Sequence, residues 1–263
     1  MSSFSGFSRT EKTLVGYLPA GFPTVDGAVR TLTAMAESGC GALEIGLPYT
    51  DPVMDGPAIQ TAATKALENG TRTEDVLRTV ERVAAATGVP IFVMTYWNPI
   101  EQYGIDRFAQ RLSDAGGAGC VLPDLPVQHS LPWREVADKH DLAGVFVAAP
   151  SSTDKRVAEI ARASTGFVYA ASTMGVTGMR SEVSGQDLVA RIRAATELPV
   201  FVGLGVSNGR QAAEVASFAD GVIVGSAIVR RMLDAPDVDT GIAEIRTLCA
   251  ELADGTRRLV GSP

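Results

Sequence analysis

The chain has 263 residues, of which 46% are hydrophobic and 20% charged, so it can bury a sizeable core and lacks the composition of a disordered protein. Its formal net charge is −7 and its Lys and Arg residues form no cluster, which argues against a binder of duplex nucleic acid. The longest apolar runs are too short to span a bilayer, and the first residues lack the basic and apolar regions of a signal peptide.

Short apolar runs alternate with amphipathic stretches along the chain. Eight runs rich in Val, Ile, Leu, Phe and Tyr are predicted to be strands: residues 13–18, 42–47, 90–96, 119–122, 142–148, 166–171, 199–202 and 221–224. Eight amphipathic stretches are predicted to be helices: residues 25–38, 73–86, 105–115, 128–139, 154–163, 186–196, 208–217 and 238–252. Two further helices are expected, one at residues 57–68 and a short one that begins at Ser226.

Eight strands that alternate with eight helices are the count that closes a parallel barrel, and barrels of this kind have roughly 250 residues. An open, doubly wound sheet is the main alternative, but the first strand-to-helix turn, residues 17–21, contains no GxGxxG. No Ser/Gly linker divides the chain into two smaller domains. The sequence therefore predicts a single (β/α)8 TIM barrel over residues 1–263, with extra helices after strands 2 and 8.

Glu44 interrupts an apolar strand between Leu43 and Ile45. An ionised carboxylate in such surroundings is costly unless it is paired or its pKa rises. One reading is a Glu that points outward and is neutralised by an Arg of a helix. However, side chains alternate along a strand, so if Leu43 and Ile45 pack under helices, Glu44 lies inside the barrel mouth. There it would be a candidate general acid and base.

A loop constrained by proline and glycine follows this strand and carries Asp51 and Asp55. Ordinary turn chemistry also explains Asp before Pro or Gly. Close to Glu44 at the mouth of a barrel, however, a functional role is the better interpretation than turn chemistry, because two carboxyl groups in different environments can divide acid–base and electrostatic roles. Asp55, eleven positions after Glu44, is far enough along the loop to fold back over the barrel mouth.

Glycine-bearing turns follow the predicted strands six, seven and eight, at residues 175–178, 203–207 and 225–227. Barrels commonly bind phosphate after strands seven and eight, through backbone N–H groups and the N-terminus of a short helix. The last two turns contain no Lys or Arg, so we expect backbone donors and a helix dipole to hold the anion.

Residues 43–57, LEIGLPYTDPVMDGP, resemble the signature of the tryptophan synthase alpha subunit family. Further matches follow in the order of that family: MTYWNP at 94–99, PDLP at 123–126, GVTG at 175–178, GLGVS at 203–207 and GSAI at 225–228. The resemblance extends from about Leu14 to Val229 and implies the retro-aldol cleavage of indole-3-glycerol phosphate to indole and glyceraldehyde 3-phosphate, a lyase reaction of tryptophan biosynthesis. It departs from the family at residues 1–12, which are Ser-rich and poor as the helix that usually closes the barrel's bottom.

The resemblance also implies roles for individual residues. Glu44 would be the proton shuttle, and Asp55 would accept a hydrogen bond from the indole N–H and stabilise positive charge. The substrate-binding residues would be Tyr17, Tyr96, Leu122 and Leu204 along an apolar slot, Tyr169 beside Glu44, Thr177 on a loop that contacts Asp55, and Gly178, Gly205, Gly225 and Ser226 around the phosphate. Barrel packing alone would also explain each of the four slot residues.

No metal or other cofactor is expected in this chain, because the reaction needs none and the two histidines, His129 and His140, show no metal-ligand spacing. The family's partner is a pyridoxal-phosphate β subunit in an α2β2 complex, and Pro48, Asp51 and Pro52 would face it. Cys40, Cys120 and Cys249 are widely spaced and are expected to be reduced, buried thiols of a cytoplasmic protein.

Three alternatives stay open at this point. The chain could be a stand-alone lyase that releases free indole from the same substrate. It could be a phosphosugar isomerase on the same barrel, although the loop at residues 48–57 argues against that reading. It could also be a catalytically idle barrel that regulates a partner, which an intact pair of Glu44 and Asp55 disfavours.

Overall fold

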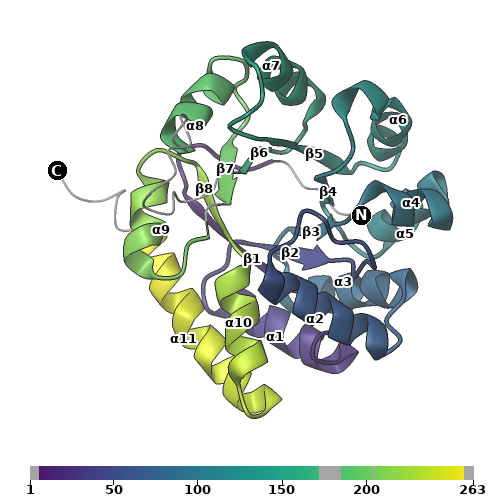
Figure 1. Cartoon of the computed structure of the whole chain (residues 1–263), viewed down its shortest axis with the longest axis vertical. Helices are drawn as coiled ribbons and strands as arrows, with labels where there is room; N and C mark the ends of the chain where they lie inside the picture. The colour runs from purple at the N-terminus through teal and green to yellow at the C-terminus, as the bar shows by residue number, and fades with distance from the viewer. Residues whose placement is uncertain (1–5, 172–184, 204, 258–263) are drawn as a thin grey trace.

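A computed structural model describes residues 6–171, 185–203 and 205–257, and these residues build a closed barrel of eight parallel strands. Figure 1 shows the strands at the centre and the helices around them. The strands are β1 (Thr13–Pro19), β2 (Ala42–Gly46), β3 (Ile91–Met94), β4 (Gly119–Leu122), β5 (Ala143–Ala148), β6 (Val168–Ala171), β7 (Val200–Gly203) and β8 (Gly221–Val224). Each strand pairs with its neighbour in the chain, and β8 pairs with β1, which confirms the predicted barrel.

The described helices include the eight predicted around the barrel and the two extra ones. They are α1 (Val25–Glu37), α2 (Pro57–Glu68), α3 (Thr73–Thr87), α4 (Trp97–Tyr103), α5 (Ile105–Asp114), α6 (Leu131–Lys139), α7 (Asp154–Ala163), α8 (Gly185–Arg193), α9 (Gly209–Ala216), α10 (Ser226–Asp234) and α11 (Val238–Arg257). The sequence interpretation missed α4, and the helix it placed at 128–139 is a 3-10 turn, Val127–His129, followed by α6. In α4, Pro99 falls within the first turn, where a helix tolerates proline.

The strands alternate between two hydrophobic clusters, because successive side chains of a strand point to opposite faces. One cluster fills the barrel and includes Val15, Phe92, Val121 and Phe201. Most of the other lies between the strands and the helices, and the strand residues on either side of Glu44 belong to it. The alternation therefore assigns Glu44 to the barrel interior.

An aromatic plug closes the end of the barrel at which the strands begin. Residues 6–12 contain no helix, and the Phe7 ring lies 4.8 Å from the Phe201 ring, measured between centroids, within the interior cluster. Asp220 holds the same segment, since its buried carboxylate lies 3.5 Å from Lys12 Nζ and 2.7 Å from Arg193 Nη2. Packing and a buried ion pair thus hold the described N-terminal segment, from residue 6 on, against the barrel bottom.

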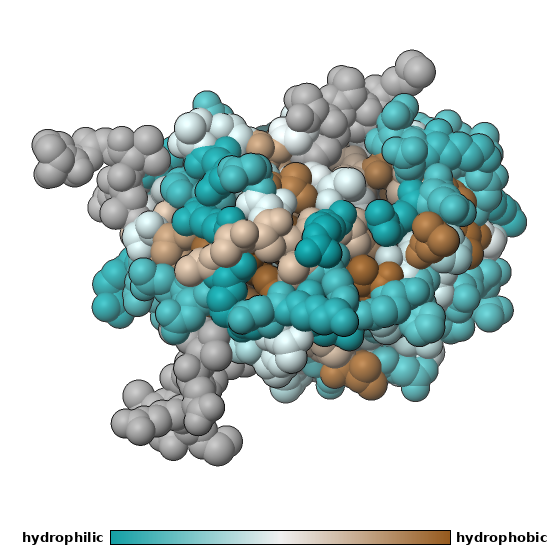
Figure 2. Space-filling model, turned by 90° about the horizontal axis from the view of Figure 1, so that it is seen from above, coloured by the Kyte–Doolittle hydropathy of each residue, from teal (hydrophilic) through white to brown (hydrophobic). Residues whose placement is uncertain are grey.

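The outer surface is largely polar. Seen from above relative to Figure 1, one face is mostly hydrophilic with small, separate hydrophobic patches (Figure 2). No helix among the described residues combines the length and the apolar character needed to cross a membrane.

Candidate active site

Glu44 lies inside the barrel, near the ends at which the strands finish. It is 1% exposed, and β2 places it in register with Tyr17 of β1 and Phe92 of β3. Among the described residues Glu44 forms no ion pair, and its Oε1 atom has no hydrogen-bond partner. Burial raises the pKa of Glu44 to about 8. The outward, Arg-paired alternative is therefore wrong, and the side chain keeps a proton at neutral pH.

Asp55 lies in the segment between β2 and α2 and is half-buried. Burial raises the pKa of its carboxyl to about 6, so Asp55 is mostly ionised at pH 7. Its backbone N–H donates to the carbonyl oxygen of Pro52 over 3.0 Å, which tightens the turn that carries it. The two carboxyl groups therefore differ in charge at the same pH.

Two buried tyrosines lie near both carboxyl groups. Burial raises the pKa of Tyr17 well above its ordinary value, and the negative charges of Asp55 and Glu44 raise it further. Burial also raises the pKa of Tyr169, again with contributions from Glu44 and then Asp55. Both phenols are thus within electrostatic reach of both carboxyl groups. The ring of Tyr96, at the start of α4, is buried as well.

Two glycines make room for these tyrosine rings. A Cβ atom at Gly46 would lie 2.2 Å from the Tyr17 hydroxyl oxygen, and one at Gly203 would lie 2.4 Å from the Tyr169 hydroxyl oxygen. Any larger residue at either position would displace a phenol from the barrel mouth. The glycines at the ends of β2 and β7 therefore help to shape the site.

Leu122 does not lie where the sequence interpretation placed it. It is buried in the outer cluster, between the strands and the helices, whereas its neighbour Val121 belongs to the interior cluster. The reason is the alternation of side chains along β4. On this strand Val121 faces the barrel interior instead.

The glycine turns after β7 and β8 lie together at the predicted anion site. Gly205, with φ +66°, and Ser226, the first residue of α10, line one hollow of about 430 Å³. Gly225 is the N-terminal cap residue of α10. A Cβ atom at Gly56, the residue after Asp55, would lie 4.0 Å from Ser226 Oγ. The catalytic candidate Asp55 and the predicted phosphate site are therefore adjacent.

Charged side chains lie closer to this hollow than the sequence suggested. Arg230 and Arg231, in the second turn of α10, contribute to its lining. Arg231 lies 4.0 Å from Glu244, and the exposed Arg230 has no ion-pair partner among the described residues. The two turns themselves contain no cation, as expected, but the hollow does. Helical spacing was the missed signal, because Arg230 follows Ser226 by one turn.

Some of the predicted residues lie outside the described ones or away from the surface. Thr177, Gly178 and Leu204 fall in the parts of the chain that the structure does not describe. Of the three residues predicted to face a partner, Asp51 is exposed and Pro52 is half-buried, whereas Pro48 is buried.

Two large apolar side chains on the same loop escaped the sequence interpretation. Val53 is 81% exposed and Met54 is 58% exposed. Exposed apolar side chains beside one another are typical of protein interaction sites. The segment around Asp51 therefore presents an apolar surface that the sequence prediction did not include.

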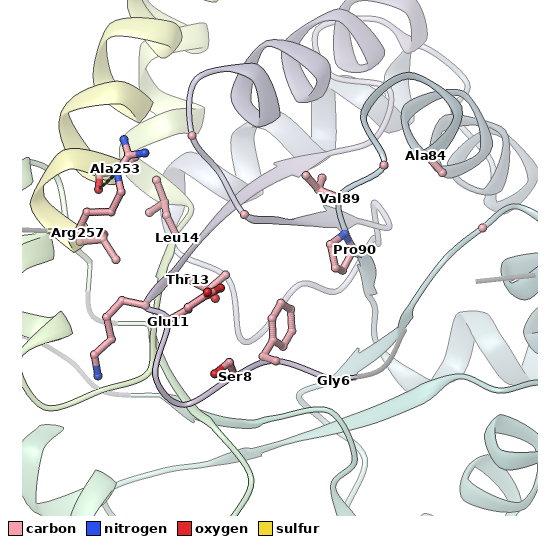
Figure 3. A pocket seen from close by; sticks show the side chains of 17 residues that line it. Gly6, Ser8, Glu11, Thr13, Leu14, Ala84, Val89, Pro90, Ala253 and Arg257 are labelled. Atoms are coloured by element: carbon pink, nitrogen blue, oxygen red, sulfur yellow. Dashed lines mark hydrogen bonds between the residues drawn. The ribbon is translucent and has the colours of Figure 1, made fainter. Parts of the chain in front are cut away.

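A cavity of about 770 Å³ lies at the opposite end of the barrel. Figure 3 shows its lining, which includes Glu11, Thr13 and Pro90 at or just before the first residues of strands, and Arg257 at the end of α11. Active sites of such barrels lie at the other ends of the strands. The candidate functional site is therefore the one at Glu44 and Asp55. No group of three or more His, Cys, Asp or Glu side chains among the described residues could hold a metal ion.

Comparison with known proteins gives a consistent result. The family model "Tryptophan synthase alpha chain" matches residues 5–257. The chain is 61% identical over 252 residues to the tryptophan synthase alpha chain of Streptomyces coelicolor, which covers 95% of this chain and 93% of that protein. It is 54% identical to the tryptophan synthase alpha chain of Thermobifida fusca, with coverage of 93% and 92%.

Solved structures show the same likeness. A chain of tryptophan synthase from M. tuberculosis superimposes with a TM-score of 0.87 and 47% identity, over 95% of this chain and 94% of that one. A tryptophan synthase subunit alpha from Legionella pneumophila superimposes with a TM-score of 0.84 and 32% identity, over 94% and 93% of the two chains. The sequence match and the barrel with its two carboxyl groups lead to one assignment: the chain belongs to the tryptophan synthase alpha chain family.

Proposed function

We propose that Glu44 and Asp55 are the catalytic residues of this chain, and that they perform its family's reaction. The chain is a carbon–carbon lyase of that family, which cleaves indole-3-glycerol phosphate within tryptophan biosynthesis. The observation that carries the assignment is that Glu44 is buried with an unpartnered Oε1 atom while the half-buried Asp55 lies at the same barrel mouth. This burial raises the pKa of Glu44 to about 8 and that of Asp55 to about 6. Such a pair supplies an acid and an anion at neutral pH.

Glu44 acts as the proton shuttle. Protonated at neutral pH, it delivers its proton to C3 of the indole ring, which leaves the ring as a cationic indolenine. The resulting carboxylate then removes the proton from the glycerol hydroxyl group. The C–C bond breaks as the carbonyl of glyceraldehyde 3-phosphate forms, and the bonding electrons return to the ring to give indole. Glu44 is thereby reprotonated, so no net proton is consumed.

Asp55 provides the electrostatic part of the mechanism. Its carboxylate accepts a hydrogen bond from the indole N–H and stabilises the positive charge that develops on the ring nitrogen. Tyr17 and Tyr96 border the ring slot, and Tyr169 lies beside Glu44, which supports substrate contacts for all three. On β4, Val121 is better placed than Leu122 to form the wall of this slot, because it belongs to the interior cluster. Leu204 and Thr177 complete the proposed set on the basis of the family motif alone.

The phosphate of the substrate binds at the start of α10. Gly205, Gly225 and Ser226 offer backbone N–H groups and a hydroxyl there, and the positive end of the helix dipole favours an anion. Arg230 adds a positive charge to the hollow, which offsets the negative field of a chain with net charge −7. Gly178 belongs to this site by the family motif.

Membership of this family implies a β-subunit partner. We propose that the two chains form an α2β2 complex, and that Asp51, Pro52, Val53 and Met54 contact the partner. The exposure of Val53 and Met54 supports this surface, whereas the buried Pro48 would support the loop from beneath. The alpha chain needs no cofactor itself, and the proposal assigns pyridoxal phosphate to the partner.

We further propose a single-domain organisation and a cytoplasmic location. Residues 1–263 act as a single domain, because the strands from Thr13 to Val224 close one barrel and α11 packs against it. The protein acts in the cytoplasm, which its three buried, free thiols support, since such thiols persist in reducing compartments.

An indole-release assay tests the proposal. The purified chain is given indole-3-glycerol phosphate, and free indole is measured with and without a β subunit. We expect slow release alone and faster cleavage with the partner. Equal rates in both conditions would instead indicate a stand-alone lyase, and absence of release in both would contradict the proposed reaction.

A further inference from the structure

Two sequence motifs near the site lie at residues 94–99 and 123–126, and apart from the ring of Tyr96 the mechanism above gives them no role. The structure joins them at the start of α4. The backbone N–H of Trp97 donates to both carboxylate oxygens of Asp124, over 2.9 and 3.2 Å. A carboxylate at a helix N-terminus satisfies an otherwise unpaired donor and favours the helix dipole. Asp124 therefore fixes the start of α4, whose N-terminal cap residue is Tyr96.

Tyr96 in turn contacts the loop that carries Asp55. Its hydroxyl oxygen accepts a hydrogen bond of 2.9 Å from the backbone N–H of Met54. The Tyr96 ring is only 6% exposed and lies 5.2 Å from the ring of Tyr49, which is on the same loop. Asn98 of α4 donates to the Tyr49 hydroxyl over 3.1 Å. The loop is thus attached to α4 at two points.

Gln60, in the first turns of α2, holds the loop from its other side. Its Nε2 atom donates to the carbonyl oxygen of Asp55 over 2.8 Å and approaches that of Pro52 at 3.4 Å. The backbone N–H of Asp55 also donates to Pro52. Gln60 therefore fixes the peptide group after Asp55, and Pro52 fixes the one before it. Tyr96 fixes the peptide group one residue further upstream, through the N–H of Met54.

We propose that Tyr96 and Gln60 are positioning residues that hold the Asp55 carboxylate in the barrel mouth. Tyr96 acts through the peptide N–H of Met54, and Gln60 acts through the carbonyl of Asp55. The proposal rests on the catalytic role proposed for Asp55. The Tyr96 ring borders the substrate slot, but its hydroxyl group serves the loop. Loss of either bond lets the loop sample positions in which Asp55 is not aligned with the indole N–H.

The test uses the Tyr96→Phe variant, which lacks the hydroxyl group and keeps the ring. The matched control is Tyr103→Phe at the other end of α4, where the lost hydroxyl group is bound to Glu74 over 2.6 Å, away from the loop. We expect kcat to fall about five- to tenfold in the Tyr96 variant, the size of one hydrogen bond, with KM little changed. The control keeps the wild-type kcat. Gln60→Ala, at an exposed side chain, serves as a second variant that leaves the core intact, with the same expected loss.

A double-mutant cycle shows whether Tyr96 acts through Asp55. In the background of Asp55→Asn, Tyr96→Phe is expected to cause no further loss of kcat, because the group that it positions is already gone. The same factor of loss in both backgrounds, or a Tyr96 variant and a Gln60 variant as active as the wild type, would overturn the inference. Full activity of the Asp55 variant alone would instead overturn the catalytic role of Asp55, so the two failures are distinguishable.

Discussion

The Glu44→Gln substitution is expected to raise the free energy of unfolding at neutral pH, because burial penalises the ionised carboxyl of the wild type. In the folded chain the carboxyl keeps its proton up to a pKa of about 8, whereas the unfolded chain loses it near 4.5. Between these values the folded state binds more protons than the unfolded state. The free energy of unfolding of the wild type therefore falls as pH rises through this window. Glutamine has the same shape and does not ionise.

The expected magnitude follows from the pKa values. Each pH unit between 4.5 and 8 removes about 1.4 kcal/mol from the wild type relative to the variant. The variant should therefore be as stable as the wild type near pH 4.5, more stable by about 3 kcal/mol at pH 7, and more stable by about 5 kcal/mol above pH 8. The difference grows with pH and then stops growing.

Urea unfolding followed by circular dichroism measures this difference at several pH values. Glu74→Gln is a control of opposite sign. Hydrogen bonds from Tyr103 and Arg111 lower the pKa of Glu74, so its replacement should reduce stability at neutral pH. A difference between the Glu44 variant and the wild type that is the same at every pH would refute the claim that burial keeps this carboxyl protonated.

Three further predictions concern activity, the barrel bottom and the phosphate site. The kcat/KM for cleavage should follow a bell-shaped curve with limbs near pH 6 and pH 8, because Asp55 must be ionised and Glu44 protonated; a rate unchanged from pH 5 to 9 would contradict this. Phe7→Ala should lower the free energy of unfolding by about 2–4 kcal/mol and leave KM unchanged, as thermal and urea unfolding can check; an equally stable variant would show that the plug contributes nothing. Ser226→Asp should weaken the binding of glyceraldehyde 3-phosphate at least about tenfold in a calorimetric titration, because the new carboxylate would repel the phosphate at the start of α10. An unchanged affinity would place the phosphate elsewhere.

The sequence predicted the barrel and the position of Glu44 for the same reason. Each strand shows a clear apolar run, and a lone carboxylate between Leu43 and Ile45 marks which face of its strand is the interior. In β4 no residue provides such a mark, because Cys120, Val121 and Leu122 are all apolar. The choice between Val121 and Leu122 therefore depended on the register of the closed barrel, which the run itself does not contain.

Other features depend on contacts between residues far apart in the chain. The seven residues of α4 are too few for a clear helical period, and Asp124, from the end of another strand, completes the cap. The insertion of Phe7 into the barrel depends on aromatic partners on β3 and β7. The hydroxyl group of Tyr96 accepts a hydrogen bond from the backbone N–H of Met54, and no pattern around Tyr96 or Met54 predicts this pairing. Local patterns carry no information on such pairings.

The central claim is that Glu44 moves the proton that breaks the C–C bond. The most direct measurement is indole release from indole-3-glycerol phosphate by the Glu44→Gln variant, together with its affinity for glyceraldehyde 3-phosphate. We expect the rate to fall by at least about 10³-fold while the affinity for the phosphate ligand stays at the wild-type value. Indole release at the wild-type rate by a folded variant would contradict the mechanism.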